Sequence, residues 1–201
     1  MSTLPNFCWA TVMLCLLGSA QVFASPLSKC ACNVSAQETT RLLSLSYQDF
    51  DQDPHEGWRP YYERECYAQA RDLLLAYVAE HPDLADEHYM LRFHAGQLLA
   101  MTGDYEKAKT YMRRAYTKLQ SQKIDWNAFV DANIAFLDKD KPKLMEMRSR
   151  IAKQPELKAG PGIPLWAVGR IMNLDVVDGF IACFEKPYVI AYGERCRESG
   201  E

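Results

Sequence analysis

The sequence contains few of the features that mark common enzymes and nucleic-acid-binding proteins. Its 201 residues carry 23 Lys and Arg against 26 Asp and Glu, which gives a formal charge of only −3. Binding to nucleic acid requires a clear excess of bases somewhere on the fold, so this composition argues against it. The sequence also has no zinc-protease, serine-hydrolase, phosphate-loop or dinucleotide motif. It therefore predicts a protein that is not an enzyme and that uses no cofactor or metal.

Long hydrophobic runs are also scarce, and the clearest one lies at the N-terminus. Residues 7–17 form a mostly apolar run of 11 residues. A membrane-spanning helix needs about 20 such residues, whereas the core of a signal peptide has about this length. We predict that residues 1–24 are a signal peptide, with cleavage between Ala24 and Ser25, although a buried N-terminal helix is the alternative. The mature protein is then periplasmic or secreted and has no stable membrane anchor.

Cysteines are few enough to be considered individually. After cleavage five remain, namely Cys30, Cys32, Cys66, Cys183 and Cys196. Cysteines in an oxidising compartment tend to pair. We predict a Cys183–Cys196 disulfide and a second one that joins Cys66 to Cys30 or Cys32. The spacing of Cys30 and Cys32 is too tight for both thiolates to bind one tetrahedral metal ion comfortably.

The positive signal in the sequence is a repeated helical pattern. From Tyr89 to Tyr116, apolar residues recur at spacings of three and four on both sides of a turn at Gly103, which predicts two helices in a hairpin. An upstream segment matches it at an offset of 38 residues, and a downstream segment from Trp126 to Ala152 matches at 36 or 37. The apolar register does not decide between the last two values.

The central hairpin resembles a tetratricopeptide repeat through Gly96, the segment from Gly103 to Glu106, Ala108 and Ala115. Its neighbours resemble degenerate copies, with spacings longer than the family period of about 34. The resemblance covers residues 51–153, about half of the chain. It implies an all-α fold, a short right-handed stack of antiparallel helix pairs (an α-solenoid) with capping helices. The motif residues are those that pack helices together, so the resemblance says little about function.

The remaining segments are predicted to flank this stack. Residues 25–50 form an N-terminal capping segment whose helix begins at a capping box from Ser35 to Glu38. Residues 51–153 form the three hairpins, and residues 154–201 form a linker followed by capping helices near residues 174–184 and 187–192. Asp49, Asp51 and Asp53 begin like a calcium-binding loop, but prolines occupy two required positions, so we expect a solvated acidic turn.

Charge is distributed unevenly along the predicted stack. Residues 49–92 contain 11 acids and 4 bases, whereas residues 105–158 contain 7 acids and 13 bases. Such runs are typical of solvated helix faces. A molecule with oppositely charged ends would also steer a complementary partner.

These patterns favour a protein-interaction module whose concave helical face binds a protein or peptide. The repeat register places seven residues on that face: Arg59, Tyr62, Glu63, Phe93, Gln97, Met101 and Val130. An inhibitor or immunity-like protein that blocks an enzyme is one alternative. Another is a small hydrolase with an unrecognised site, such as a cluster of His81 and His88 with Asp83 or Asp86, or a pairing of Cys66 with a distant histidine.

Export makes a direct prediction about the N-terminus. Mass spectrometry of the protein recovered from the envelope or medium should give an N-terminal residue near Ser25, because the small residues before it match the signal-peptidase recognition pattern. Recovery of a cytosolic protein that retains Met1 would contradict this prediction.

Overall fold

The structure is a computed structural model that describes residues 32–118, 124–161 and 163–198; the predicted signal peptide and Cys30 lie outside these ranges. The described residues form helices and no strands, which confirms the all-α prediction. The longer helices are α1 (Ala36–Leu43), α3 (Tyr67–Glu80), α5 (Tyr89–Met101), α6 (Tyr105–Arg113), α7 (Trp126–Leu137), α8 (Lys141–Ile151) and α9 (Leu174–Ala182). The shorter ones are η2 (Gln48–Gln52), α2 (Arg59–Glu63), α4 (Pro82–Glu87), η3 (Leu165–Ala167), α10 (Tyr188–Ala191) and α11 (Glu194–Glu198).

Three of the turns between helices share one backbone conformation. Glu65, Gly103 and Lys139 have positive φ angles of 59°, 88° and 57°. In each turn, the next backbone N–H donates a hydrogen bond to the carbonyl group five residues earlier: Cys66 to Tyr61, Asp104 to Leu99 and Asp140 to Ala135. This is the Schellman pattern that ends a helix. The three turns lie 38 and 36 residues apart.

Local residues stabilise the first turns of several helices. The Asp104 carboxylate accepts a hydrogen bond from the Lys107 backbone N–H at the start of α6. At the start of α1, the Ser35 hydroxyl oxygen accepts a hydrogen bond from the Glu38 backbone N–H. Pro142 lies in the first turn of α8, where its missing N–H leaves no intrahelical bond unmade. Each cap depends on residues within one helical turn, so it can be predicted without knowledge of tertiary structure.

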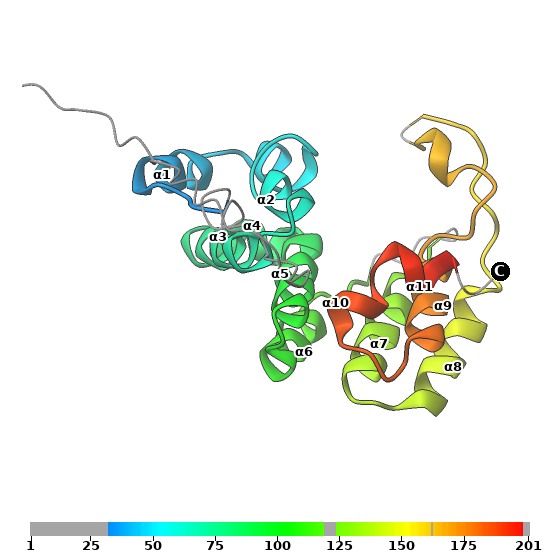
Figure 1. Ribbon diagram of the computed structural model, residues 1–201. Helices are drawn as coiled ribbons and strands as arrows, with labels where there is room; N and C mark the ends of the chain where they lie inside the picture. Colours follow the sequence, from blue (N-terminus) through cyan, green and yellow to red (C-terminus); the bar gives the residue numbers. More distant parts are fainter. Residues whose placement is uncertain (1–31, 119–123, 162, 199–201) are drawn as a thin grey trace, which may run out of the picture.

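The helices pack mainly as hairpins between sequence neighbours. Helix α5 lies along α6, and α7 lies along α8, while α3 packs on α5 and α6 packs on α7. Figure 1 shows the N-terminal helices at one end, α5 and α6 in the middle and α7 to α9 at the other end. A Cβ atom added to Gly96 would lie 2.9 Å from the Ala108 carbonyl oxygen. Glycine is therefore required where α5 and α6 approach most closely.

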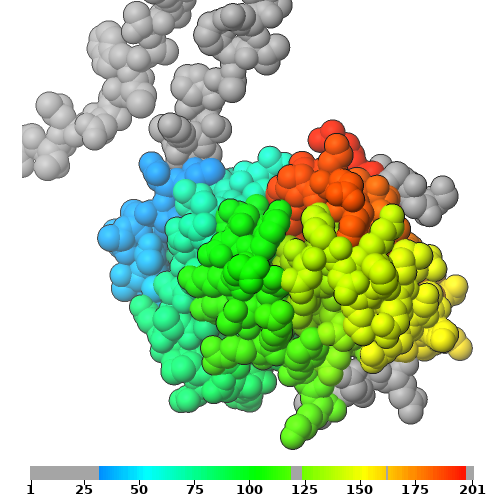
Figure 2. Space-filling view, turned by 90° about the horizontal axis from the view of Figure 1, so that it is seen from below, coloured from blue at the N-terminus to red at the C-terminus, as the bar shows by residue number. Residues whose placement is uncertain are grey.

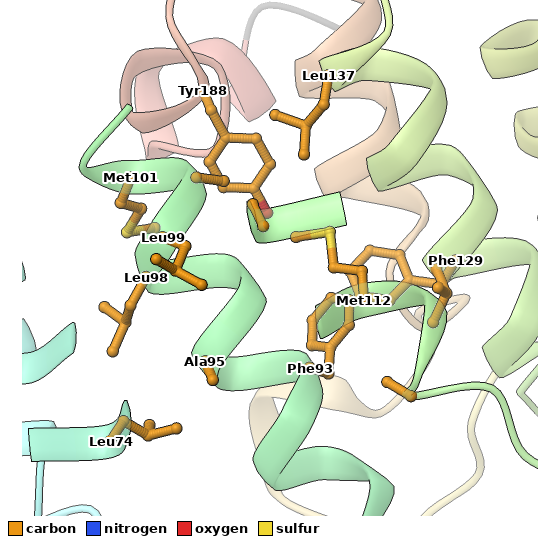
Figure 3. Packing of buried hydrophobic residues seen from close by; sticks show 14 of the residues in the cluster. Leu74, Phe93, Ala95, Leu98, Leu99, Met101, Met112, Phe129, Leu137 and Tyr188 are labelled. Atoms are coloured by element: carbon orange, nitrogen blue, oxygen red, sulfur yellow. The ribbon is translucent and has the colours of Figure 1, made fainter. Parts of the chain in front are cut away.

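The C-terminal helices join the same hydrophobic core rather than forming a separate cap. Helix α9 packs on α7 and α8, and α10 reaches back to α5. On the face seen in Figure 2, the orange C-terminal segment lies against the green and yellow hairpins. The buried Tyr188 of α10 donates a hydrogen bond of 2.6 Å to the Asn133 side-chain oxygen on α7. Figure 3 shows its ring between Leu137 and the end of α5 that carries Met101.

Two disulfides fasten the ends of the described chain. Cys183 and Cys196 are bonded, as predicted, with a Cα separation of 5.9 Å. Cys66 is bonded to Cys32, with a Cα separation of 5.4 Å, which resolves the choice between Cys32 and Cys30. Paired cysteines of this kind are typical of an oxidising, extracellular or periplasmic environment.

The prediction of a solvated acidic turn at Asp49 to Asp53 is wrong. This segment forms the π-helix η2, in which Phe50 and Asp51 are completely buried. The Phe50 ring stacks on Tyr77 of α3 at a centroid distance of 3.8 Å. Asp51, which follows Phe50, is buried with it, and hydrogen bonds to its carboxylate compensate for the loss of contact with water.

The close approach of α5 and α6 makes Ala108 sensitive to side-chain volume. Ala108→Trp should lower the free energy of unfolding by about 1 to 3 kcal/mol or more, because Ala108 is fully buried and the added ring overpacks the core. Ala79→Trp, on an exposed position of α3, is the matched control. Equal denaturation midpoints for the two variants would contradict this view of the α5–α6 contact.

Candidate functional site

The structure divides the seven predicted partner-binding residues into two groups. Phe93, Gln97 and Met101 of α5 and Val130 of α7 are buried, so they contribute to the core rather than to an exposed face. Phe93 packs against the rings of Trp126 and Phe129, and the polar side chain of Gln97 interacts with Tyr192, which follows α10. The chain's own C-terminal segment thus takes part of the surface that was expected to receive a partner.

The three remaining residues, Arg59, Tyr62 and Glu63, lie together on α2, and we call their accessible side the α2 face. Glu63 is exposed, while Arg59 and Tyr62 are half-buried. Burial raises the pKa of the Tyr62 hydroxyl, with a smaller contribution from Tyr192, so Tyr62 stays neutral and able to donate a hydrogen bond. The α2 face therefore offers a cation, a neutral phenol and an anion within five residues.

A buried aspartate holds this face in place. Asp51 is 0% exposed, and its Oδ1 atom accepts hydrogen bonds from the Trp58 indole N–H at 3.0 Å and from His94 Nδ1 at 2.8 Å. The Gln52 amide donates to the second carboxylate oxygen. The Asp51 carbonyl oxygen accepts a 2.7 Å hydrogen bond from Arg59 Nε. One residue therefore connects η2, the start of α2 and the centre of α5.

Burial alone would raise the pKa of the Asp51 carboxyl, but its partners outweigh that effect. The charge and hydrogen bond of His94, the Trp58 hydrogen bond and the Arg59 charge together hold the pKa below its ordinary value. Asp51 is accordingly ionised at neutral pH. An ionised carboxylate can only accept hydrogen bonds, which fixes the His94 proton on Nδ1.

The second ring nitrogen of His94 has no hydrogen-bond partner among the described residues. In the part of the chain that the structure describes, the buried side-chain polar atoms without a partner are Arg92 Nε and Gln154 Oε1. His94 is only 7% exposed, and its Nε2 atom forms no hydrogen bond with a described residue. A histidine oriented by a buried carboxylate can act as a base or as a hydrogen-bonding group toward a bound molecule.

The pair is not apparent in the sequence, because Asp51 and His94 are 43 residues apart. The signal that could have found them is the polar His94 within the mostly apolar helix α5. The histidines that were considered instead have structural contacts: His81 Nε2 lies 2.8 Å from the Leu43 carbonyl oxygen, and His88 stacks on Tyr47. Cys66 is disulfide-bonded and cannot serve as a thiol nucleophile. No group of three or more potential metal ligands occurs among the described residues.

Arg59 is the best-organised part of the α2 face. Its guanidinium carbon lies 4.6 Å from the Trp58 ring centroid, a cation–π geometry. Its Nε atom is committed to Asp51, but its terminal nitrogens bond to none of the described residues. The two terminal nitrogens of a positioned guanidinium, with four N–H donors, are therefore available to an external carboxylate or carbonyl group.

A surface cavity of about 320 Å³ lies elsewhere, beside the Cys32–Cys66 disulfide. Its polar lining comes from Asn33, Thr39, Gln69 and Asp72. It opens next to Cys32, where the described chain begins, and we assign no ligand to it.

The predicted separation of charge has a spatial counterpart. The acidic residues 49–92 form the helices from η2 to the start of α5, while the basic residues 105–158 form α6 in the middle of the molecule and α7 and α8 toward the other end (Figure 1). Several of the charges are paired, including Arg150 with Asp125 and Arg148 with Asp178.

Comparison with known proteins adds no identity. No family model, curated protein or solved structure matches the chain. Among the described residues, no helix is long and apolar enough to cross a membrane.

The Asp51 network makes a prediction about stability. Asp51→Ala leaves the Trp58 and His94 donors buried without their acceptor and should lower the free energy of unfolding by about 3 to 5 kcal/mol, measured by chemical denaturation. Glu80→Ala, which removes an exposed carboxylate from α3, should change it by about 0.5 kcal/mol at most.

The pH dependence follows from the lowered pKa of Asp51. Ionised Asp51 stabilises the fold fully above the unfolded-state pKa of about 4, and this contribution is lost as the pH falls through the lower pKa of the folded state. The stability difference between the wild type and Asp51→Asn should therefore shrink in acid. A difference that stays constant over that range would show that the charge of Asp51 does not matter.

Proposed function

We propose that the chain is an exported protein-interaction module that binds a protein or peptide through the α2 face. Its three hairpins form a short stack of degenerate tetratricopeptide-like units in this proposal. The recurrence of one turn conformation at spacings of 38 and 36 residues supports the repeat. The two disulfides support function outside the reducing cytosol.

The observation that carries the proposal is the organisation of Arg59. Its side chain is held by the Asp51 carbonyl group and the Trp58 ring before any partner arrives. Binding then costs little side-chain entropy, which is a property of strong interface residues. Arginine and tyrosine are also the residue types most enriched at the energetic centres of interfaces.

The chemistry of the α2 face suggests what a partner presents to it. The free guanidinium donors of Arg59 fit a carboxylate, and the neutral Tyr62 hydroxyl fits an acceptor beside it. An acidic loop of the partner, or its C-terminal carboxylate, would provide acceptors for both groups. An inhibitor or immunity-like protein that blocks an enzyme would use the same face, and it remains the specific alternative within this class.

A hydrolase is the second candidate, and the Asp51–His94 pair is the observation that favours it. The buried Asp51 carboxylate orients the His94 ring as it would orient a general base, with Nε2 unpaired among the described residues. The structure places no hydroxyl or free thiol of a described residue in hydrogen-bonding contact with Nε2, so this base would have to activate water or a substrate group.

Site-specific photo-crosslinking tests the interaction. A photo-reactive side chain that replaces Tyr62, introduced in the producing cell, should yield one defined protein adduct. The same group at the exposed Tyr116 should not yield it. Arg59→Ala should weaken the affinity for that partner about 30-fold, which corresponds to about 2 kcal/mol, because the anchoring guanidinium is lost. Arg114→Ala, which removes an exposed arginine after α6, serves as the matched control.

Two results would contradict the proposal. One is a Tyr62 adduct pattern that Arg59→Ala leaves unchanged. The other is hydrolysis of an ester or peptide by the purified protein that is abolished in His94→Gln but retained in Arg59→Ala. The second result would favour the hydrolase.

A further inference from the structure

The connection between α8 and α9 exposes an apolar tip. Leu165 is 91% exposed, Trp166 is 64% exposed and Val168 is 38% exposed. Figure 1 shows this yellow-to-orange segment extending away from the helices on either side of it. Three large apolar side chains exposed within four residues are unusual, because water makes their exposure unfavourable.

The tip is a built feature rather than an unsupported loop. At its base, the Leu157 N–H donates to the Arg170 carbonyl oxygen at 2.9 Å, and the Gly169 N–H donates to the Leu157 carbonyl oxygen at 2.8 Å. Leu157 is 4% exposed and Ala167 is fully buried. Because Ala167 points inward from the 3-10 helix η3, its neighbours Trp166 and Val168 are directed outward.

Basic residues lie on both sides of this tip in the sequence. Lys153 and Lys158 precede it and Arg170 follows it, and all three are exposed. None of the three forms an ion pair with another residue that the structure describes. Glu156 is the sole acid in the sequence from Lys153 to Arg170. The charge beside the apolar tip is therefore positive and is not neutralised within the described chain.

We propose that residues Leu165, Trp166 and Val168 insert into the interfacial region of a phospholipid bilayer that contains anionic lipids, while Lys158 and Arg170 contact the lipid phosphates. Tryptophan favours the membrane–water interface, and basic residues beside an apolar surface strengthen binding to anionic lipids. The segment that carries the tip extends away from the neighbouring helices (Figure 1), which suits insertion into a bilayer better than enclosure of a ligand. The contact is peripheral and reversible, since three side chains do not form a permanent anchor.

This inference is independent of the α2 face, which lies on the N-terminal half of the chain. A bilayer contact at the tip would keep the protein at the envelope and leave the α2 face available to a partner. A protein with an apolar pocket could also accept Trp166. The free bases on both sides of the tip favour a surface of dense negative charge over such a pocket.

Vesicle binding tests the proposal. The protein is used with the N-terminus it carries after export, and it is mixed with vesicles of phosphatidylcholine and phosphatidylglycerol in equal parts. Wild-type protein should sediment with these vesicles, and lipids brominated in the acyl chains should quench its Trp166 fluorescence, a signal that Trp166→Phe lacks. Trp58 and Trp126 are buried and do not report on the contact.

The double variant Leu165→Ser, Trp166→Ser should bind the vesicles at least about tenfold more weakly. Ile190→Ser, which removes an apolar residue of α10 that is 50% exposed, is the matched control and should bind like the wild type. Because Leu165 and Trp166 are solvent-exposed, circular dichroism should show that the double variant is folded.

The electrostatic contribution is tested separately. Lys158→Glu with Arg170→Glu should weaken binding at least about tenfold, as should vesicles of phosphatidylcholine alone or high salt. Lys107→Glu, at an exposed position of α6, is the control. Absence of Trp166 quenching, or vesicle binding that the tip variants leave unchanged, would overturn the proposal. Loss of a protein adduct in the tip variants without any change in vesicle binding would assign the tip to a protein pocket instead.

Discussion

Helix α5 is buried on all sides from Leu91 to Met101, and a helix in that position must be enclosed by other elements. Helices α3, α4, α6 and α10 pack around it, so segments far apart in sequence are brought together. The helix also carries polar groups that need partners in the interior. Arg92 pairs with Asp86, His94 with Asp51, and Gln97 with Tyr192. Each pairing ties a different part of the chain to the same helix.

This enclosure determines what a partner can contact. Helix α5 would line the inner surface of an open helical stack, but here the C-terminal segment covers part of it. The proposed interaction is consequently confined to α2. The hydrogen bonds of Asp51 to Trp58 and Arg59 hold this helix in position. Rigidity and accessibility are thus combined in Arg59, whose backbone-bonded Nε fixes the side chain while its terminal nitrogens remain available. That combination is why a short helix of five residues can serve as a binding surface.

The two proposed contacts lie on different parts of the molecule and depend on different kinds of interaction. The α2 face depends on oriented hydrogen-bond donors close to a buried carboxylate, and it is suited to selective binding. The tip at Leu165 and Trp166 depends on apolar area and nearby positive charge, neither of which is directional. An exported protein that uses both would be held at a surface without occupying the site that recognises its partner.

The sequence by itself determined the features that depend on nearby residues. Helix caps at Ser35 and Asp104, the hairpin turn at Gly103 and the Cys183–Cys196 disulfide were all predictable, since each involves a short chain segment with defined chemistry. Tertiary structure alone decided the burial of Asp51, its contact with His94 across 43 residues and the burial of Phe93, Gln97, Met101 and Val130. The reason is that the exposure of a helix face depends on which distant segment packs against it, and local periodicity records only that a face is apolar.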